Sequence, residues 1–158
     1  MTLVPLDVIL TLDVRHEVPA TIEEGTLASL ARFALSHEGA SGEWQVGVLM
    51  TSDADIQSMH REFMDLDSPT DIMTFPYDEN DPFTPTELRT SGGDIVISVE
   101  TAESNARDAG WDLGRELEFL LLHGLLHLLN WDDETPEQRV AMLGRQQVIL
   151  DDWHETAG

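Results

Sequence analysis

Two histidines lie four residues apart in a leucine-rich run towards the end of the chain. In a helix this spacing puts His123 and His127 on one face, where two imidazoles can hold one metal ion. Asn130 follows, and asparagine tolerates the left-handed conformation that ends helices. The chain then turns, so that Asp132 or Asp133 can return as a third ligand. Two imidazoles and one carboxylate leave a position open for water, which is typical of a catalytic rather than a structural metal.

A simpler interpretation competes with this one. Six histidines in 158 residues sometimes fall four apart by chance, and a histidine on an apolar helix is often a core residue. Gly124 favours the metal site, because glycine inside a helix costs about 1 kcal/mol relative to alanine, so a close approach to this backbone or tight helix packing is expected. Gly124 also replaces the glutamate that serves as general base in zinc peptidases with the H-E-x-x-H motif, which argues against ordinary peptide hydrolysis.

The charge of the chain limits its partners. It has 31 acidic residues and 8 basic residues, and its formal net charge is -23. All 8 basic residues are arginine. This predicts a heavily solvated acidic surface, or else a surface for a basic partner such as a ribosomal protein or for divalent cations. It opposes broad nucleic-acid binding, so we expect no DNA partner.

Other features of the composition indicate the class of protein. Cysteine is absent, which excludes a disulfide scaffold and thiolate metal ligands. From the acidic residues in the apolar N-terminal stretch we expect no signal peptide, and no apolar run approaches the roughly 20 residues that a membrane span needs. From the length we expect a single domain over residues 1–158, in a soluble, cytoplasmic protein.

Hydrophobic periodicity predicts an α+β domain. Strands are expected at residues 7–14, 44–50, 71–75 and 94–98, with a long exposed loop at 76–92. Helices are expected at 21–35, 53–63, 100–109, 113–129 and from 136 to about 153. Thr21 and Ser52 are predicted N-caps, Gly110 ends a helix, and Thr135 with Gln138 forms a capping box. The first strand, helix and second strand should form a parallel crossover unit.

Three sequence blocks together resemble the YbeY family of bacterial rRNA maturation factors, regarded as single-strand-specific endoribonucleases. The family hallmark H-G-x-L-H-L-x-G-Y-D-H is similar to residues 123–133. Its P-T-D-V-L-S-F-P block is similar to residues 69–76, and its G-D-I-x-I-S block to residues 93–98. One block alone would be a weak signal, whereas three blocks in order are specific, and the order of the predicted elements fits nearly the whole chain.

The resemblance implies a zincin-like fold, with a small mixed four-stranded sheet, about five helices and a metal site on a central helix. It also implies a zinc-dependent endoribonuclease that matures the 3′ end of small-subunit (16S) rRNA in ribosome biogenesis. The expected partners are single-stranded rRNA and the small ribosomal subunit or its basic proteins. An alternative is a non-catalytic assembly or quality-control factor that keeps the metal for structure and binds basic ribosomal proteins.

Two positions depart from the family pattern. The third histidine of the hallmark is Asp133 here, which gives a His123, His127 and Asp133 ligand set and extends the tolerance from Zn²⁺ to Mn²⁺ or Fe²⁺. The family arginine before the P-T-D block aligns with Met64, and Arg61, one helical turn away, is a candidate substitute.

The remaining roles are less specific. Asp132 matches the family aspartate beside the third ligand, and we assign it to support of a histidine. Asp94, Thr70 and Asp71 match family blocks near the cleft, but structural roles at strand ends are favoured for them. His154 is expected on the surface. No general base can be named, so a metal-bound water is the expected nucleophile or proton relay.

Overall fold

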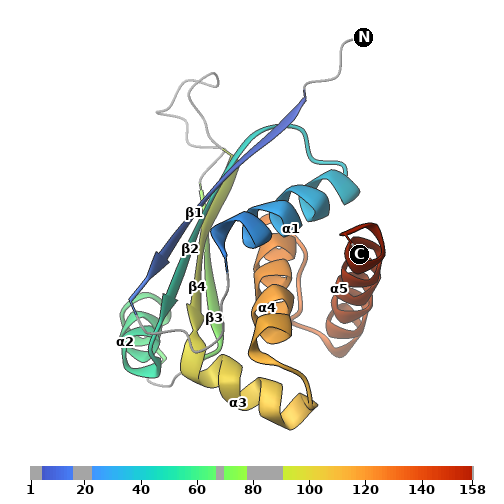
Figure 1. Ribbon diagram of the computed structural model, residues 1–158. Coiled ribbons are helices and arrows are strands. Elements are labelled where there is room, and N and C mark those ends of the chain that lie inside the picture. The colour runs from blue at the N-terminus through green and yellow to red at the C-terminus, as the bar shows by residue number, and fades with distance from the viewer. Residues whose placement is uncertain (1–4, 16–22, 67–69, 78–90, 158) are drawn as a thin grey trace, which may run out of the picture.

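The computed structural model describes residues 5–15, 23–66, 70–77 and 91–157. In this part of the chain four strands form one sheet in the order β1-β2-β4-β3, and five helices surround it (Figure 1). β1, β2 and β4 are parallel to one another, whereas β3 is antiparallel to β4. The predicted mixed sheet and helices are confirmed. The elements are β1 (Leu6–Val14), α1 (Glu24–His37), β2 (Gly42–Thr51), α2 (Asp53–Met64), β3 (Ile72–Pro76), β4 (Ser91–Ser98), α3 (Val99–Ala109), α4 (Leu113–Leu128) and α5 (Pro136–Ala157).

Two predicted helix boundaries were wrong. α1 begins at Glu24, later than predicted, because its first turn opens on the Glu23 carbonyl, which accepts from the Leu27 amide at 3.2 Å. The proposed Thr21 cap lies outside the described residues. α5 continues past Trp153 to Ala157, and in its last turn the Thr156 hydroxyl donates to the Asp152 carbonyl at 2.8 Å.

β4 also begins earlier than predicted, at Ser91 instead of Asp94. Gly92 and Gly93 suggested a loop, yet both pair with β2. Gly92 has a φ of +125°, and a Cβ on it would lie 1.9 Å from the Gln45 carbonyl oxygen. Only glycine allows this approach of the two strands, so here glycine belongs to the sheet. Residues 78–90 of the predicted loop, and Pro69 of the P-T-D block, lie outside the described residues.

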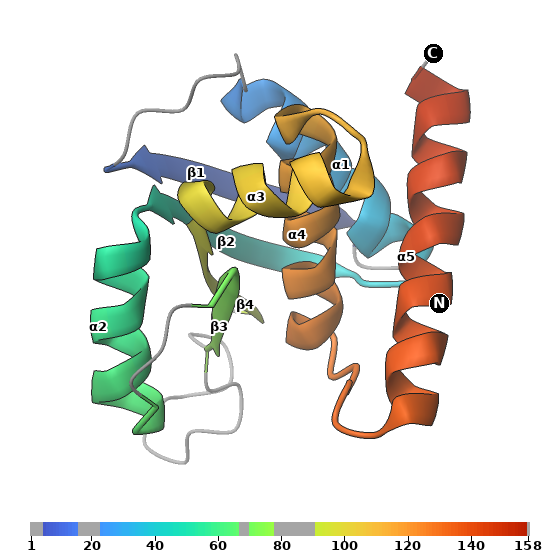
Figure 2. The same cartoon turned by 90° about the horizontal axis from the view of Figure 1, so that it is seen from below.

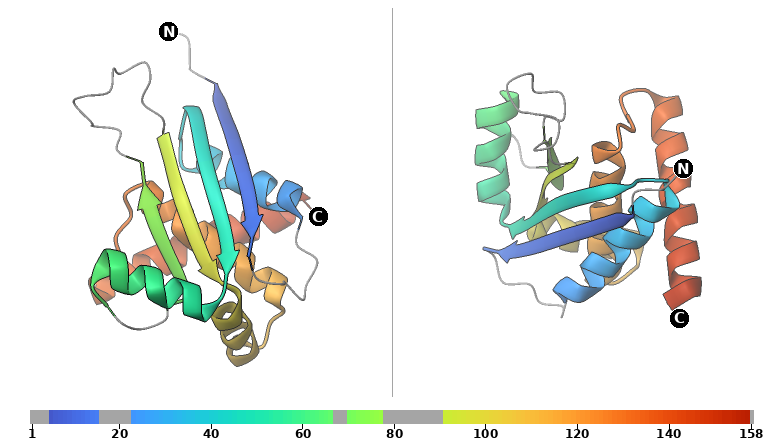
Figure 3. Two further views of the ribbon diagram at one scale, coloured as in Figure 1. Left: turned by 90° about the vertical axis from the view of Figure 1, so that its left-hand side faces the viewer. Right: turned by 90° about the horizontal axis from the view of Figure 1, so that it is seen from above.

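The two faces of the sheet are covered unequally. α1 and α4 pack on one face, where side chains from β1, β2 and β4 such as Leu10, Val46 and Ile95 join the main core, and α5 packs on the outer side of these two helices (Figures 1 and 3). The predicted parallel crossover is confirmed, since α1 connects the parallel strands β1 and β2. On the other face α2 lies across the ends of the strands, where Ile56 packs against Met73 and Val96. Its predicted cap is also confirmed, because the Ser52 hydroxyl accepts from the Asp55 amide.

α4 lies close against the sheet at Gly124. A Cβ on Gly124 would meet three side-chain atoms of Ile95 at 2.9, 3.0 and 3.1 Å. Gly124 is therefore explained by helix-to-sheet packing, one of the two alternatives predicted from the sequence.

α4 and α5 form a helical hairpin (Figure 2). Asn130 has a φ of +72°, as predicted for the residue that ends the histidine helix. The predicted capping box also forms at the start of α5: the Thr135 hydroxyl accepts from the Gln138 amide at 3.1 Å, and the Gln138 side chain accepts from the Thr135 amide at 3.0 Å. Among the helices in the described ranges, none is long and apolar enough to cross a membrane.

An ion pair ties α1 to α5. The Arg145 guanidinium donates from Nε and Nη2 to the Glu38 carboxylate, with distances of 2.9 Å and 2.5 Å. These hydrogen bonds lower the pKa of Glu38 below its ordinary value of 4.5, although burial opposes the shift. His37 lies beside this pair and contacts Asp152 through Nε2 at 3.1 Å.

Gly124→Ala should destabilise the protein, because the added methyl group would collide with Ile95. Such overpacking costs about 1–3 kcal/mol. The higher helix propensity of alanine offsets only about 1 kcal/mol of this cost. Gly144→Ala is the matched control, since a Cβ on Gly144 meets no atom within 4 Å. It should stabilise the protein by up to about 1 kcal/mol. Urea unfolding measures both, and an Ile95→Ala background should abolish the Gly124→Ala penalty. A penalty that persists there would contradict the Ile95 contact as its cause.

Arg145→Met should lower the free energy of unfolding at pH 7 by about 1–2 kcal/mol, because a charged hydrogen-bonded pair is broken. The folded-state pKa of Glu38 is lowered, so the contribution of the pair is present above pH 4.5 and is lost as the pH falls through the folded-state pKa. The difference between wild type and variant should therefore shrink in acid. Arg32→Met, which breaks an exposed 4.0 Å pair with Asp7, should change little at either pH.

Candidate metal centre

α4 is apolar on most of its surface, and its two histidines lie on the part that faces β3. The Asp112 carboxylate caps the helix by accepting from the Arg115 amide at 2.8 Å. Leucines from Leu117 to Leu128 fill the core, whereas the His123 and His127 side chains are 19% and 25% exposed. The leucine pattern therefore orients α4, and the histidines lie at the boundary between core and solvent.

The connector between α4 and α5 brings Asp133 back to the histidines. The Trp131 amide donates to the Leu126 carbonyl at 3.0 Å, which turns the chain directly after Asn130. On the other side Arg139 donates to the carbonyls of Asp133 and Glu134, both at 3.3 Å. Asp133 Oδ2 then lies 3.3 Å from His123 Nε2 and 3.4 Å from His127 Nε2. The predicted juxtaposition of these three side chains is observed.

The hydrogen bonds of the two rings determine which nitrogens face the site. His127 Nδ1 lies 3.0 Å from the Trp131 carbonyl oxygen, which can only accept, so Nδ1 carries the proton. His123 Nδ1 lies 2.9 Å from Gln146 Oε1. The Nε2 atoms of the two rings, 3.1 Å apart, therefore face each other and Asp133. Three acceptor atoms converge there, and such a group could hold a metal ion at its centre.

The spacing of these atoms fits a metal. Two ligand atoms at about 2.1 Å from a tetrahedral metal lie about 3.4 Å apart. The three separations here are 3.1, 3.3 and 3.4 Å. A proton could bridge one of these pairs at a time, whereas a metal ion satisfies all three. Within the described ranges this is the group of histidine and carboxylate side chains with the geometry to hold a metal ion.

A pocket of about 280 Å³ opens over the three side chains. α2 contributes His60 and Met64 to its lining, and the approach to β3 contributes Thr70 and Asp71. Met64, the counterpart of the family arginine in the resemblance, thus lines the pocket, while Arg61 is not among the lining residues. The sequence analysis did not select His60. The signal was present, because Ile56, His60 and Met64 follow at four-residue intervals and share one face of α2.

A second hollow of about 530 Å³ adjoins the pocket and shares Asp71, Ile72 and His123 with it. Trp111 and the buried Glu116 lie in its wall, and the Trp111 ring nitrogen donates to the Glu116 carboxylate at 2.8 Å. Burial raises the pKa of Glu116 above its ordinary value of 4.5, and this hydrogen bond partly offsets the shift. The two hollows together form an extended cleft beside the candidate ligands.

The other predicted residues lie as follows. Asp71 has a structural contact, since its carboxylate accepts from Asn105 at 3.3 Å. Asp132 is exposed, and the contacts to the Nδ1 atoms of the two rings come instead from Gln146 and the Trp131 carbonyl. His154 is exposed, as predicted.

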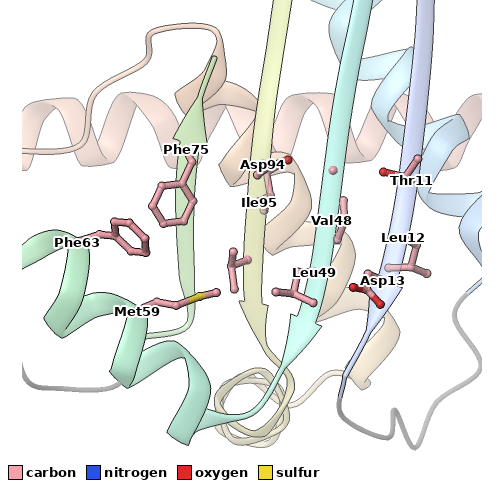
Figure 4. Close-up of a pocket in the computed structure, with 12 residues that line it drawn as sticks. Thr11, Leu12, Asp13, Val48, Leu49, Met59, Phe63, Phe75, Asp94 and Ile95 are labelled. Carbon is pink, nitrogen blue, oxygen red and sulfur yellow. The ribbon is translucent and has the colours of Figure 1, made fainter. Parts of the chain in front are cut away.

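Asp94 lies outside the metal pocket, in a groove of about 550 Å³ on the opposite face of the sheet (Figure 4). The Tyr77 hydroxyl donates to its carboxylate at 3.1 Å. Leu49, Met59 and Phe63 give this groove an apolar lining, and it is larger than the pocket that contains the candidate ligands.

Known proteins resemble this chain over most of its length. The family model described as endoribonuclease YbeY matches residues 12–154. A protein named endoribonuclease YbeY from Rhodococcus opacus is 35% identical over 150 residues, which cover 92% of this chain and 83% of the relative. The protein of the same name from Mycobacterium tuberculosis is 34% identical over 148 residues, which cover 91% of this chain and 84% of the relative.

A solved structure supports the fold. The solution structure of TM1509 from Thermotoga maritima matches with a TM-score of 0.56 and 22% identity, over 92% of this chain and 93% of that one. The family model, the curated relatives and the three sequence blocks agree, and the chain belongs to the YbeY family.

Proposed function

We propose that this protein is a metal-dependent endoribonuclease that cleaves single-stranded rRNA as a single cytoplasmic domain. The observation that carries the proposal is the convergence of two histidine Nε2 atoms and one carboxylate oxygen at tetrahedral spacing, beside an open cleft. The names of the relatives supply the reaction class, since they are called endoribonucleases. Maturation of the 3′ end of 16S rRNA, with the small ribosomal subunit as partner, is the task that the family resemblance implies.

In this proposal His123, His127 and Asp133 hold one metal ion. The donor set suits Zn²⁺, and the carboxylate extends the tolerance to Mn²⁺ or Fe²⁺. When bound, the ion supplies a Lewis acid that acidifies a coordinated water and polarises the phosphodiester. Asp133 adds a negative charge that a histidine would not, so the donor set is less effective at acidifying that water than three histidines.

Two residues of α2 face the same pocket and have different roles. Met64 provides no charge where the family arginine would stabilise the phosphate in the transition state. His60 can donate or accept a proton, and it lines the pocket beside the candidate ligands. We assign His60 to proton transfer or phosphate contact during cleavage.

Two observations favour the alternative function, a non-catalytic assembly factor that binds basic ribosomal proteins. The net charge of -23 repels the RNA backbone, and Met64 replaces the family arginine. One experiment distinguishes the two functions. It measures the cleavage of a labelled single-stranded RNA that spans the 3′ end of 16S rRNA. Protein that holds one metal ion but makes no cuts, and binds basic ribosomal proteins, would support the alternative.

His127→Ala should abolish cleavage, and Asp133→Ala should weaken metal affinity at least about tenfold, because each removes a proposed ligand. Competition with a chelator measures the affinity, and Zn²⁺ or Mn²⁺ restored after chelation should recover cleavage in wild type but not in His127→Ala. Asp132→Ala tests the role predicted for Asp132, which is to support a histidine ligand. His154→Ala is the control, since His154 is exposed and far along α5. Unchanged metal affinity in Asp133→Ala would remove Asp133 from the ligand set.

His60→Ala should lower the cleavage rate about 10²-fold, the scale of a lost proton-transfer group, without changing the metal affinity. A parallel loss of metal affinity would instead make His60 part of the metal site. A rate equal to that of His154→Ala would exclude a role for His60 in the reaction.

A further inference from the structure

One buried polar side chain of α5, Gln146, contacts the candidate metal ligand His123. Gln146 is 0% exposed and lies among the apolar side chains Met142, Ile149 and Leu150. A buried amide is costly unless its hydrogen bonds are made, so a leucine at this position would serve packing better. The partners of Gln146 therefore explain its presence.

Both ends of the Gln146 amide are hydrogen-bonded to α4. Nε2 lies 3.4 Å from the Phe119 carbonyl oxygen, and Oε1 lies 2.9 Å from His123 Nδ1. A carbonyl can only accept, so the NH₂ group must face Phe119 and the oxygen must face His123. The oxygen in turn requires a proton on His123 Nδ1. The amide therefore determines the tautomer of the ring and leaves the Nε2 lone pair free towards Asp133.

The two histidines reach this tautomer by different means. For His127 the acceptor is the Trp131 backbone carbonyl, which is present whatever side chain occupies that position. For His123 the acceptor is a side chain of another helix. Without it a neutral His123 ring is free to carry its proton on Nε2, where a proton blocks metal binding.

We propose that Gln146 is a positioning residue, which holds His123 in the Nδ1-protonated tautomer and in the ring orientation needed to bind the metal. The inference rests on the proposed function, because it takes His123 as a metal ligand. It extends the site to α5, so the packing of α5 against α4 contributes to metal affinity. Supporting hydrogen bonds of this kind typically change metal affinity by 10- to 100-fold.

The test compares three variants of the full chain. Gln146→Met keeps the length of the side chain and removes both hydrogen bonds, whereas Gln146→Glu keeps an acceptor for His123 Nδ1. Gln147→Met is the matched control, because Gln147 is the adjacent glutamine, is exposed, and bonds Asp151 on its own helix at 2.8 Å. Zn²⁺ affinity is measured by chelator competition, and the tautomer of His123 by ¹⁵N NMR of metal-free protein. Gln146→Leu is a second apolar variant in case Gln146→Met does not fold.

We expect Gln146→Met to weaken Zn²⁺ binding by 10- to 100-fold and to shift the proton of His123 towards Nε2. Gln146→Glu should retain most of the affinity, and Gln147→Met should match wild type. Equal losses in Gln146→Met and Gln146→Glu, or an unchanged tautomer in Gln146→Met, would overturn the proposal. Failure of the proposed function is distinguishable, because RNA cleavage would then be absent in wild type while the Zn²⁺ affinities and the metal-free tautomer still decide the role of Gln146.

Discussion

The close contact between α4 and the sheet at Gly124 sets the geometry of the candidate site. Because Gly124 has no side chain, Ile95 of β4 packs directly on the helix backbone. α4 then lies near enough to β3 for His123 and His127 to share a pocket with Thr70 and Asp71. A bulkier residue at position 124 would move the helix away from the sheet and both imidazoles with it. The glycine between the histidines is therefore a packing requirement with a consequence for metal binding.

Each of the three candidate ligands is held by a different part of the structure. A backbone carbonyl of the connector holds His127, a side chain of α5 holds His123, and the turn at Asn130 with the capping box of α5 returns Asp133. The acceptor atoms converge only because α4, the connector and α5 pack together. Since three acceptors that face each other repel without a cation, part of the stabilisation of this hairpin should depend on the proposed metal ion.

The chain and its proposed RNA substrate are both negatively charged and repel each other. A net charge of -23 repels RNA, and the residue aligned with the family arginine is Met64. A metal ion and His60 are then the sources of positive charge or protons in the pocket on which catalysis would rely. The proposed cleavage should accordingly depend strongly on the metal.

Periodicity, caps and spacing are local properties, so the sequence predicted the elements, the histidine helix and its end at Asn130. Spacing alone left Asp132 or Asp133 as the third candidate ligand, and the family resemblance selected Asp133. The place of Gly92 and Gly93 in β4 became visible only from the packing of the strands, since a close approach of strands gives glycine the same local signature as a loop. The tertiary structure alone brought His60 from α2 and Gln146 from α5 to the site. Gln146 is a polar residue at a core-facing position of α5, and this was a signal in the sequence. Its partner, however, lies 23 residues away along the chain, and only the packing of two helices selects it.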